Sequence, residues 1–146
     1  MFRKTRHIHF IGIGGIGMSG MAELLQKLGF QISGSDSTLS ERTAQLSKLG
    51  IQIYEGHDGS NVLDSDVVVY SSAVPKDNPE IVEAIKQNIP VIRRAEMLGE
   101  LLKVKSTSVA IAGTHGKTST SSILGSILTE SNLDPTLVIG GIVNKF

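Results

Sequence analysis

Two glycine-rich stretches of this sequence have residue types and spacings that bind phosphate groups. The first, Gly12-Ile13-Gly14-Gly15-Ile16-Gly17, matches the pattern G-x-G-x-x-G. Its glycines permit a tight turn, allow the backbone to approach a pyrophosphate, and let the next helix pack closely on the preceding strand. The second stretch, Gly113-Thr114-His115-Gly116-Lys117-Thr118, ends in the Gly-Lys-Thr of loops that bind nucleoside triphosphates. The sequence therefore predicts two separate phosphate-binding loops.

The first loop lies between a predicted strand and a predicted helix, which is the position that binds a nucleotide pyrophosphate. A predicted strand over residues 7–13 precedes it and a predicted helix over residues 18–29 follows, so free N–H groups and a positive helix dipole face the anion. Asp36 ends the next predicted strand, about 20 residues on, where dinucleotide sites place a carboxylate that binds ribose. The pattern predicts a nucleotide without saying which one. The alternative is that these glycines only allow a close turn from strand to helix.

The second loop is a shortened version of the triphosphate-binding pattern. We expect Lys117 to act on the β- and γ-phosphates as a point charge and the Thr118 hydroxyl to bind Mg²⁺. In G-x-x-x-x-G-K-[ST] the leading glycine would stand at position 111, which is Ile111; Gly113 instead opens a shorter loop. This departure argues against ordinary P-loop proteins such as GTPases. The alternative is a polar helix start that matches by chance.

Strands and helices are predicted to alternate along the chain. The predicted strands are residues 7–13, 30–36, 51–56, 66–72, 90–94, 109–113 and 136–143, and the predicted helices are residues 18–29, 40–49, 79–88, about 95–103 and 118–130. Alternation of this kind is typical of an α/β fold with a doubly wound parallel sheet. Residues 1–103 already make a complete Rossmann-like unit. Residues 104–146 supply only the start of a second, P-loop domain.

Composition excludes several classes of protein. Fourteen basic and 14 acidic residues among 146 leave no net charge, which argues against binding to nucleic acid or to a membrane surface by charge alone. No cysteine is present, so there is no disulfide and no thiolate metal site. The basic N-terminus runs into glycines at Gly12 instead of an apolar signal segment, and no apolar run could span a bilayer. We therefore expect a cytoplasmic protein, and its oligomeric state is open.

The stretch "GTHGKTST" (113–120) resembles the ATP loop of the Mur ligases, the amide ligases that build peptidoglycan. Other stretches that resemble this family are "HFIGIGGIGMSGMAELL" (9–25), "GSD" (34–36), "VVYSSAVPKDNPEI" (68–81) and "RRAEMLGEL" (93–101). The resemblance covers nearly the whole chain. Members are far longer and carry a UDP-sugar domain, an ATPase domain and an amino-acid domain. The resemblance implies that residues 1–103 are the first of these and residues 104–146 the truncated beginning of the second.

The resemblance also implies a reaction and its site residues. In similar enzymes ATP phosphorylates the carboxylate of UDP-N-acetylmuramate, and the amine of L-alanine then attacks the acyl phosphate. A member that recycles murein tripeptides has a similar layout but usually a different first loop. The implied UDP-sugar-binding residues are Gly12, Gly14, Gly15, Ile16, Gly17, Ser19, Asp36, His57, Ser71 and Ser72. The implied ATP-binding residues are Gly113, Thr114, His115, Gly116, Lys117, Thr118 and Ser119, with Lys117 catalytic and Thr118 on Mg²⁺. The 146-residue chain alone is expected to be an incomplete, inactive enzyme.

Two other functions fit part of the pattern. An NAD(P)-binding oxidoreductase domain explains the first loop and Asp36 but leaves residues 113–118 unexplained. A non-catalytic nucleotide-binding module explains both loops without a reaction. Arg93 and Arg94 either meet phosphate or are simply solvated, and the residues alone assign them no role.

Overall fold

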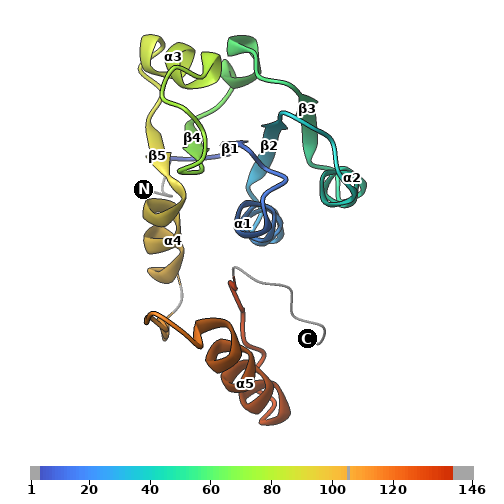
Figure 1. The fold of residues 1–146 in the computed structure, drawn as a ribbon, viewed down its shortest axis with the longest axis vertical. Coiled ribbons are helices and arrows are strands. Elements are labelled where there is room, and N and C mark those ends of the chain that lie inside the picture. The colour runs from blue at the N-terminus through green and yellow to red at the C-terminus, as the bar shows by residue number, and fades with distance from the viewer. Residues whose placement is uncertain (1–3, 105, 140–146) are drawn as a thin grey trace.

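A parallel five-stranded sheet in the order β3-β2-β1-β4-β5 forms the centre of the fold (Figure 1). The computed structural model describes residues 4–104 and 106–139. The strands are β1 (His7–Ile11), β2 (Gln31–Asp36), β3 (Gln52–Glu55), β4 (Val67–Tyr70) and β5 (Val91–Arg93). All four neighbouring pairs run parallel. The predicted doubly wound α/β fold is confirmed for this part of the chain.

Helices cover both faces of this sheet. They are α1 (Ile16–Lys27), α2 (Glu41–Lys48), the 3₁₀ turn η1 (Gly59–Val62), α3 (Pro79–Lys86), α4 (Arg94–Leu102) and α5 (Lys117–Glu130). Helices α1, α2 and α4 contribute Met21, Leu46 and Met97 to the larger core cluster. Val62 of η1 and Ile81 of α3 pack on the opposite face in a smaller cluster. Two helical layers therefore enclose one sheet, as the alternating pattern predicts.

The central strand β1 sends different side chains to its two faces. Ile8 and Phe10 are buried in the larger cluster beneath α1, whereas Ile11 belongs to the smaller cluster on the α3 side. Because side chains alternate along a strand, His7 and His9 share the face of Ile11. Both histidines are buried, and His9 is 0% exposed. A polar layer consequently lies between the sheet and α3.

Gly34 in β2 is packed so closely that alanine should destabilise the fold. A Cβ built at this position would lie 2.5 Å from Ile13 Cδ1 and 2.8 Å from the carbonyl oxygen of Phe10. The carbonyl belongs to the neighbouring strand and cannot retreat, so we expect Gly34→Ala to lower the free energy of unfolding by about 1–3 kcal/mol. Urea unfolding would measure the loss. Gly20→Ala in α1, where nothing lies within 4 Å of the added carbon, is the matched control and should not destabilise. Equal stability of the two variants would contradict this packing.

The predicted strand over residues 109–113 is wrong. These residues pair with no strand in the described part of the chain, and Val109 is 64% exposed. A strand needs a neighbour for its N–H and C=O groups, and among the described residues no strand pairs with this segment. Residues 136–139 likewise form no strand, and the rest of that prediction, 140–143, lies outside the described residues.

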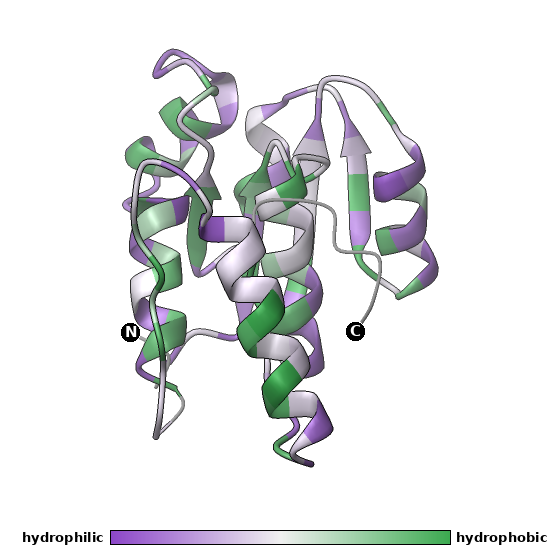
Figure 2. Cartoon of the chain, turned by 60° about the horizontal axis from the view of Figure 1, so that its bottom comes forward, coloured by the Kyte–Doolittle hydropathy of each residue, from purple (hydrophilic) through white to green (hydrophobic). Residues whose placement is uncertain are grey.

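Helix α5 lies apart from the sheet, beyond the end of α4 (Figure 1). Hydrophobic residues of this helix are coloured green on the cartoon in Figure 2, and Ile123 and Ile127 are 62% and 55% exposed. The boundary proposed at residue 103 stays a prediction. Within residues 4–104 and 106–139, no helix is long and apolar enough to cross a membrane.

Candidate functional site

The residues predicted to bind a UDP-sugar come from loops at one edge of the sheet. Gly12 follows β1, Asp36 ends β2, His57 follows β3, and Ser71 and Ser72 follow β4. Since the strands are parallel, these positions all lie at the carboxyl edge. The chain reverses its winding direction between β1 and β4, and ligands of open α/β sheets bind in the crevice at that point. The topology therefore brings the predicted site residues together.

The first glycine loop is held by the neighbouring strand. The carbonyl oxygen of Ser35 accepts hydrogen bonds from Gly12 N at 2.8 Å and from Ile13 N at 3.0 Å. Gly12 has φ +78°, which favours glycine. Helix α1 then starts without an acidic residue in its first turn, and its cap residue Gly15 contributes no side chain. The loop thus leads directly into the N-terminus of α1, the place where anion-binding turns of this kind hold their ligand.

Asp36 supports this loop directly. Its Oδ2 accepts a hydrogen bond from Gly14 N at 2.8 Å, and its Oδ1 contacts Thr38 N at 3.3 Å. A Cβ at Gly14 would lie 2.8 Å from the same Oδ2, so the close approach requires glycine. One carboxylate oxygen is therefore already engaged by the protein. Contact between Asp36 and a ribose or uracil stays a prediction.

Two arginines flank the glycine loop. Arg42 of α2 donates from Nη1 to the carbonyl oxygen of Gly14 at 2.7 Å. The guanidinium of Arg94, at the start of α4, lies against Gly17 and would overlap any side chain there. Sequence reasoning assigned no role to Arg42 and left Arg94 open. Arg93 instead pairs with Tyr70, and this hydrogen bond raises the pKa of the Arg93 guanidinium.

The serines predicted for the site differ in their surroundings. Ser19 is buried, and its hydroxyl donates to the carbonyl oxygen of Ile16 at 3.1 Å within α1. The hydroxyl of Ser71 accepts from Ala73 N at 3.2 Å, which shapes the loop after β4. Ser72 is exposed at the same edge. Their contacts to a ligand stay predictions.

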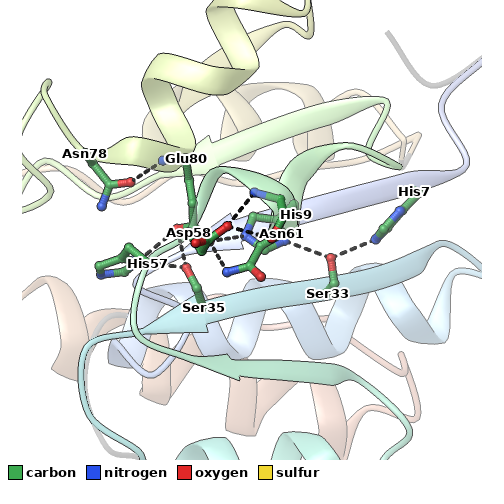
Figure 3. A network of polar contacts seen from close by, with 10 residues as sticks. His7, His9, Ser33, Ser35, His57, Asp58, Asn61, Asn78 and Glu80 are labelled. Atoms are coloured by element: carbon green, nitrogen blue, oxygen red, sulfur yellow. Dashed lines mark hydrogen bonds and ion pairs between the residues drawn. The ribbon is translucent and has the colours of Figure 1, made fainter.

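A buried carboxylate, Glu80 at the start of α3, lies behind this edge (Figure 3). Its Oε2 accepts hydrogen bonds from Ser35 Oγ at 2.5 Å and His57 Nδ1 at 2.9 Å. Its Oε1 accepts from Asn61 Nδ2 at 2.9 Å and His9 Nε2 at 3.3 Å. Burial alone would raise the pKa of Glu80, but the hydrogen bonds from His9, Ser35 and Asn61 outweigh burial and lower it. Glu80 is consequently a buried negative charge.

The Ser33 hydroxyl joins the two buried histidines His7 and His9. His7 Nδ1 donates to the carbonyl oxygen of Asp64 at 2.8 Å, and His9 Nε2 donates to Glu80. The other two ring nitrogens face the Ser33 hydroxyl at 2.7 Å and 2.8 Å. One hydroxyl hydrogen serves only one of them, so the tautomers of the two rings decide which nitrogen accepts from Ser33 and which donates to it.

The second glycine loop is open to solvent. Gly116, the residue before α5, has φ +78°, which suits glycine at this position. Lys117 folds back, and its Nζ donates to the carbonyl oxygen of Gly113 at 2.5 Å. Thr114, His115, Thr118 and Ser119 are all exposed, and α5 has no acidic residue in its first turn. The residue types and backbone fit a phosphate ligand. Among the residues described, no group of three His, Cys, Asp or Glu could hold a metal ion, so Thr118 is a single candidate ligand.

Comparison with known proteins identifies the family. Residues 7–106 match the sequence profile described as the Mur ligase family, catalytic domain. The chain belongs to the Mur ligase family. The resemblance read from the two loops is therefore confirmed. The match includes the glycine loop, Asp36, His57 and the serines after β4.

Individual members of the Mur ligase family resemble the chain throughout. The UDP-N-acetylmuramate–L-alanine ligase of Desulfotalea psychrophila is 55% identical over 146 residues, which are 100% of this chain and 32% of that protein. The crystal structure of UDP-N-acetylmuramate–alanine ligase from Thermotoga maritima has a TM-score of 0.87 at 40% identity. The match covers 94% of this chain and 32% of the Thermotoga chain. The chain thus spans about a third of the length of these relatives.

A second type of Mur ligase has nearly the same fold. UDP-N-acetylmuramate:L-alanyl-γ-D-glutamyl-meso-diaminopimelate ligase from Neisseria meningitides has a TM-score of 0.86 at 35% identity, covering 97% of this chain and 45% of that one. Fold similarity alone therefore does not separate the two ligases.

Proposed function

We propose that this chain is the UDP-sugar-binding part, with the start of the ATP-binding part, of a ligase that joins L-alanine to UDP-N-acetylmuramate. The observation that carries the proposal is the 55% identity to such a ligase along the entire chain. The glycine loop at the switch point of the sheet supports it. The tripeptide ligase is the second candidate in the family, and a solved ligase of that type is less similar, at 35% identity.

In this proposal the first loop binds the UDP pyrophosphate. The phosphates lie against the loop from Gly14 to Gly17 and the N-terminus of α1, with Arg42 and Arg94 contributing positive charge beside them. Ser71 and Ser72 form the opposite wall. His57 is 22% exposed, and because Glu80 holds its Nδ1, only its Nε2 is left to meet the nucleotide. Gly12, Ile16, Ser19 and Asp36 shape and complete the same site.

The second loop would bind ATP. Backbone groups from Gly113 to Ser119 surround the phosphates in this proposal, and the Lys117 ammonium leaves Gly113 to offset charge on the transferring phosphoryl group. Mg²⁺ would be held by the Thr118 hydroxyl and would supply Lewis-acid polarisation of the phosphate oxygens. The carboxylate of UDP-N-acetylmuramate would then accept the phosphoryl group, and the amine of L-alanine would displace phosphate. Because ATP and UDP-sugar are its substrates, we propose that the reaction is cytoplasmic.

Ligand titration separates this function from the oxidoreductase and from a general nucleotide-binding module. Calorimetry on the 146-residue chain should show binding of UDP-N-acetylmuramate without ATP, since the first loop belongs to a complete sheet. NADH should bind more weakly. Tighter binding of NADH than of UDP would favour the oxidoreductase and contradict the proposal. In a longer protein that contains this segment, dependence of phosphate release on L-alanine, and not on the tripeptide, would separate the two ligases.

Replacing Gly14 with valine should abolish binding of the UDP-sugar. The added side chain would begin 2.8 Å from Asp36 Oδ2 and 3.2 Å from Thr43 Cγ2, and the loop could not keep its approach to phosphate. We expect affinity for UDP to fall by about a hundredfold or more, which is roughly 2.7 kcal/mol. Gly20→Ala, in open space on α1, is the control and should leave affinity unchanged. Undiminished affinity of Gly14→Val would exclude the loop from the site.

A further inference from the structure

A continuous series of hydrogen bonds joins Glu80 to the first glycine loop. Glu80 Oε2 accepts from the Ser35 hydroxyl at 2.5 Å. The carbonyl oxygen of the same Ser35 accepts from Gly12 N and Ile13 N, the first residues of the loop. Ser35 is 0% exposed, so water does not compete for either bond. Displacement of Ser35 would therefore move the loop.

Glu80 also determines how His57 faces the edge of the sheet. The His57 Nδ1 lies 2.9 Å from Glu80 Oε2 and 3.0 Å from Ser35 Oγ. Ser35 donates its only hydroxyl hydrogen to Glu80, so both contacts of His57 require a hydrogen on Nδ1. A neutral His57 then has its lone pair on Nε2, and its side chain is 22% exposed. The carboxylate thus selects the tautomer as well as the ring orientation.

We propose that Glu80 is a positioning residue for the nucleotide site: it holds the glycine loop through Ser35 and presents His57 Nε2 as an acceptor for the ligand. This inference rests on the proposed binding of a UDP-sugar at the first loop. Glu80 itself is fully buried, so it acts through the residues that it contacts. It acts by joining α3 to β2 and to the loop after β3, both of which end at the site.

A carboxylate performs this role in a way that an amide would not. Each Glu80 oxygen accepts two hydrogen bonds, four in all, from Ser35, His57, Asn61 and His9. Glutamine has the same shape but places an NH₂ group where one oxygen was, and that group would face donors. If the amide oxygen faces His57 and Ser35, the NH₂ meets Asn61 and His9; the reverse orientation disrupts Ser35 and His57. Glu80→Gln therefore perturbs proton placement with little change in volume.

The first test uses NMR of the ligand-free 146-residue chain. In the wild type, the ring ¹⁵N shifts of His57 should report hydrogen on Nδ1. In Glu80→Gln this signature should change, and the amide signals of Gly12 and Ile13 should move. Glu83→Gln, on the same helix but bonded to Lys86 and Gln87 at the surface, is the matched control and should change neither. Unchanged His57 and loop signals in a folded Glu80→Gln would overturn the proposal.

The second test measures UDP affinity in a double-mutant cycle. Glu80→Gln should weaken UDP binding by about tenfold, or ~1.4 kcal/mol, because the loop and His57 both shift. In a Ser35→Ala, His57→Ala background the same change should alter affinity by less than about twofold, since the path is already broken. An equal loss in both backgrounds would mean general destabilisation and overturn the inference.

Two outcomes keep the proposals distinguishable. If the wild-type chain binds no UDP, the proposed function fails, while the His57 and Gly12 signals still decide whether Glu80 positions the loop. If Glu80→Gln does not fold, Ser35→Ala breaks the same series of hydrogen bonds and leaves the Glu80 carboxylate in place. It should move the Gly12 and Ile13 amides and weaken UDP binding. A Ser35→Ala variant with wild-type loop signals and affinity would overturn the inference.

Discussion

Replacing Lys117 with alanine, in a longer ligase that contains this segment, should reduce ATP-dependent amide formation by at least about a hundredfold. The lysine follows the positive-φ Gly116 at the start of α5, and its ammonium already reaches across the loop to the Gly113 carbonyl. Phosphoryl transfer depends mainly on charge placed at the transferring group, and alanine removes that charge. Release of phosphate and formation of the amide product measure the effect.

Affinity for the UDP-sugar should remain nearly unchanged in Lys117→Ala, because the two loops are distinct sites that share no residue. Lys103→Ala controls for loss of a surface cation, because Lys103 follows α4 and its exposed ammonium pairs with Glu100 at 2.6 Å. Turnover of Lys117→Ala within about tenfold of wild type, or ~1.4 kcal/mol in the barrier, would rule this lysine out of the role.

Glu80→Ala should lower the free energy of unfolding by about 3–5 kcal/mol, because the polar groups around Glu80 lose the charged carboxylate that accepts their hydrogen bonds. His9, Ser35 and Asn61 would lose an acceptor, and His9 and Ser35 are fully buried. A domain of this size is stable by about 5–15 kcal/mol, so the loss is a large share of the total. Urea unfolding at pH 7 measures it. Glu83→Ala on the same helix should cost no more than about 0.5 kcal/mol.

The contribution of Glu80 should also depend on pH in a defined direction. Burial raises the pKa of Glu80, but hydrogen bonds from His9, Ser35 and Asn61 lower it by more, so the folded value lies below the ordinary 4.5. The unfolded chain therefore binds a proton first as pH falls. The stabilisation is complete above pH 4.5 and is lost as pH falls through the folded value. The gap in unfolding free energy between wild type and Glu80→Gln should narrow below pH 4.5; a gap that widens there would contradict the lowered pKa.

Local sequence was enough to predict the sheet and the first loop. Glycine spacing, helix-stopping glycines and β-branched runs act within a few residues, and they placed β1 to β5 and the helices between them close to their observed bounds. The short turn η1 was missed because its cap, Asp58, binds Ser60 within a loop that has no hydrophobic period. Residues 109–113 have strand-forming side chains, yet strand formation depends on a neighbour that local pattern cannot supply.

The candidate site was only partly predictable. The first glycine loop, Asp36 and the serines lie at the ends of strands, and parallel strands bring their ends together. Topology was therefore sufficient to predict that these residues lie at one edge of the sheet. The network around Glu80 joins segments far apart in sequence, so local pattern could not predict it. In the sequence, Glu80 follows Pro79 and is simply an acidic residue in the first turn of a helix, where it is favourable. One signal was present: His7 and His9 alternate with Ile8 and Phe10, which places both rings on one buried face.

The strand order has a consequence for how this chain folds during synthesis. On one side β1 pairs with β2, the next strand in the sequence. On its other side β1 pairs with β4, where Ile8 lies opposite Val67 and Ile11 opposite Tyr70. Half of its hydrogen-bonding partners therefore leave the ribosome only after some sixty further residues, a separation that slows folding because a long loop must close first. Until then the N–H and C=O groups on one side of β1 have no strand to pair with. Chaperones that hold nascent chains would bind it in that interval, before the loop after β4 has come to lie at the same edge as the first glycine loop.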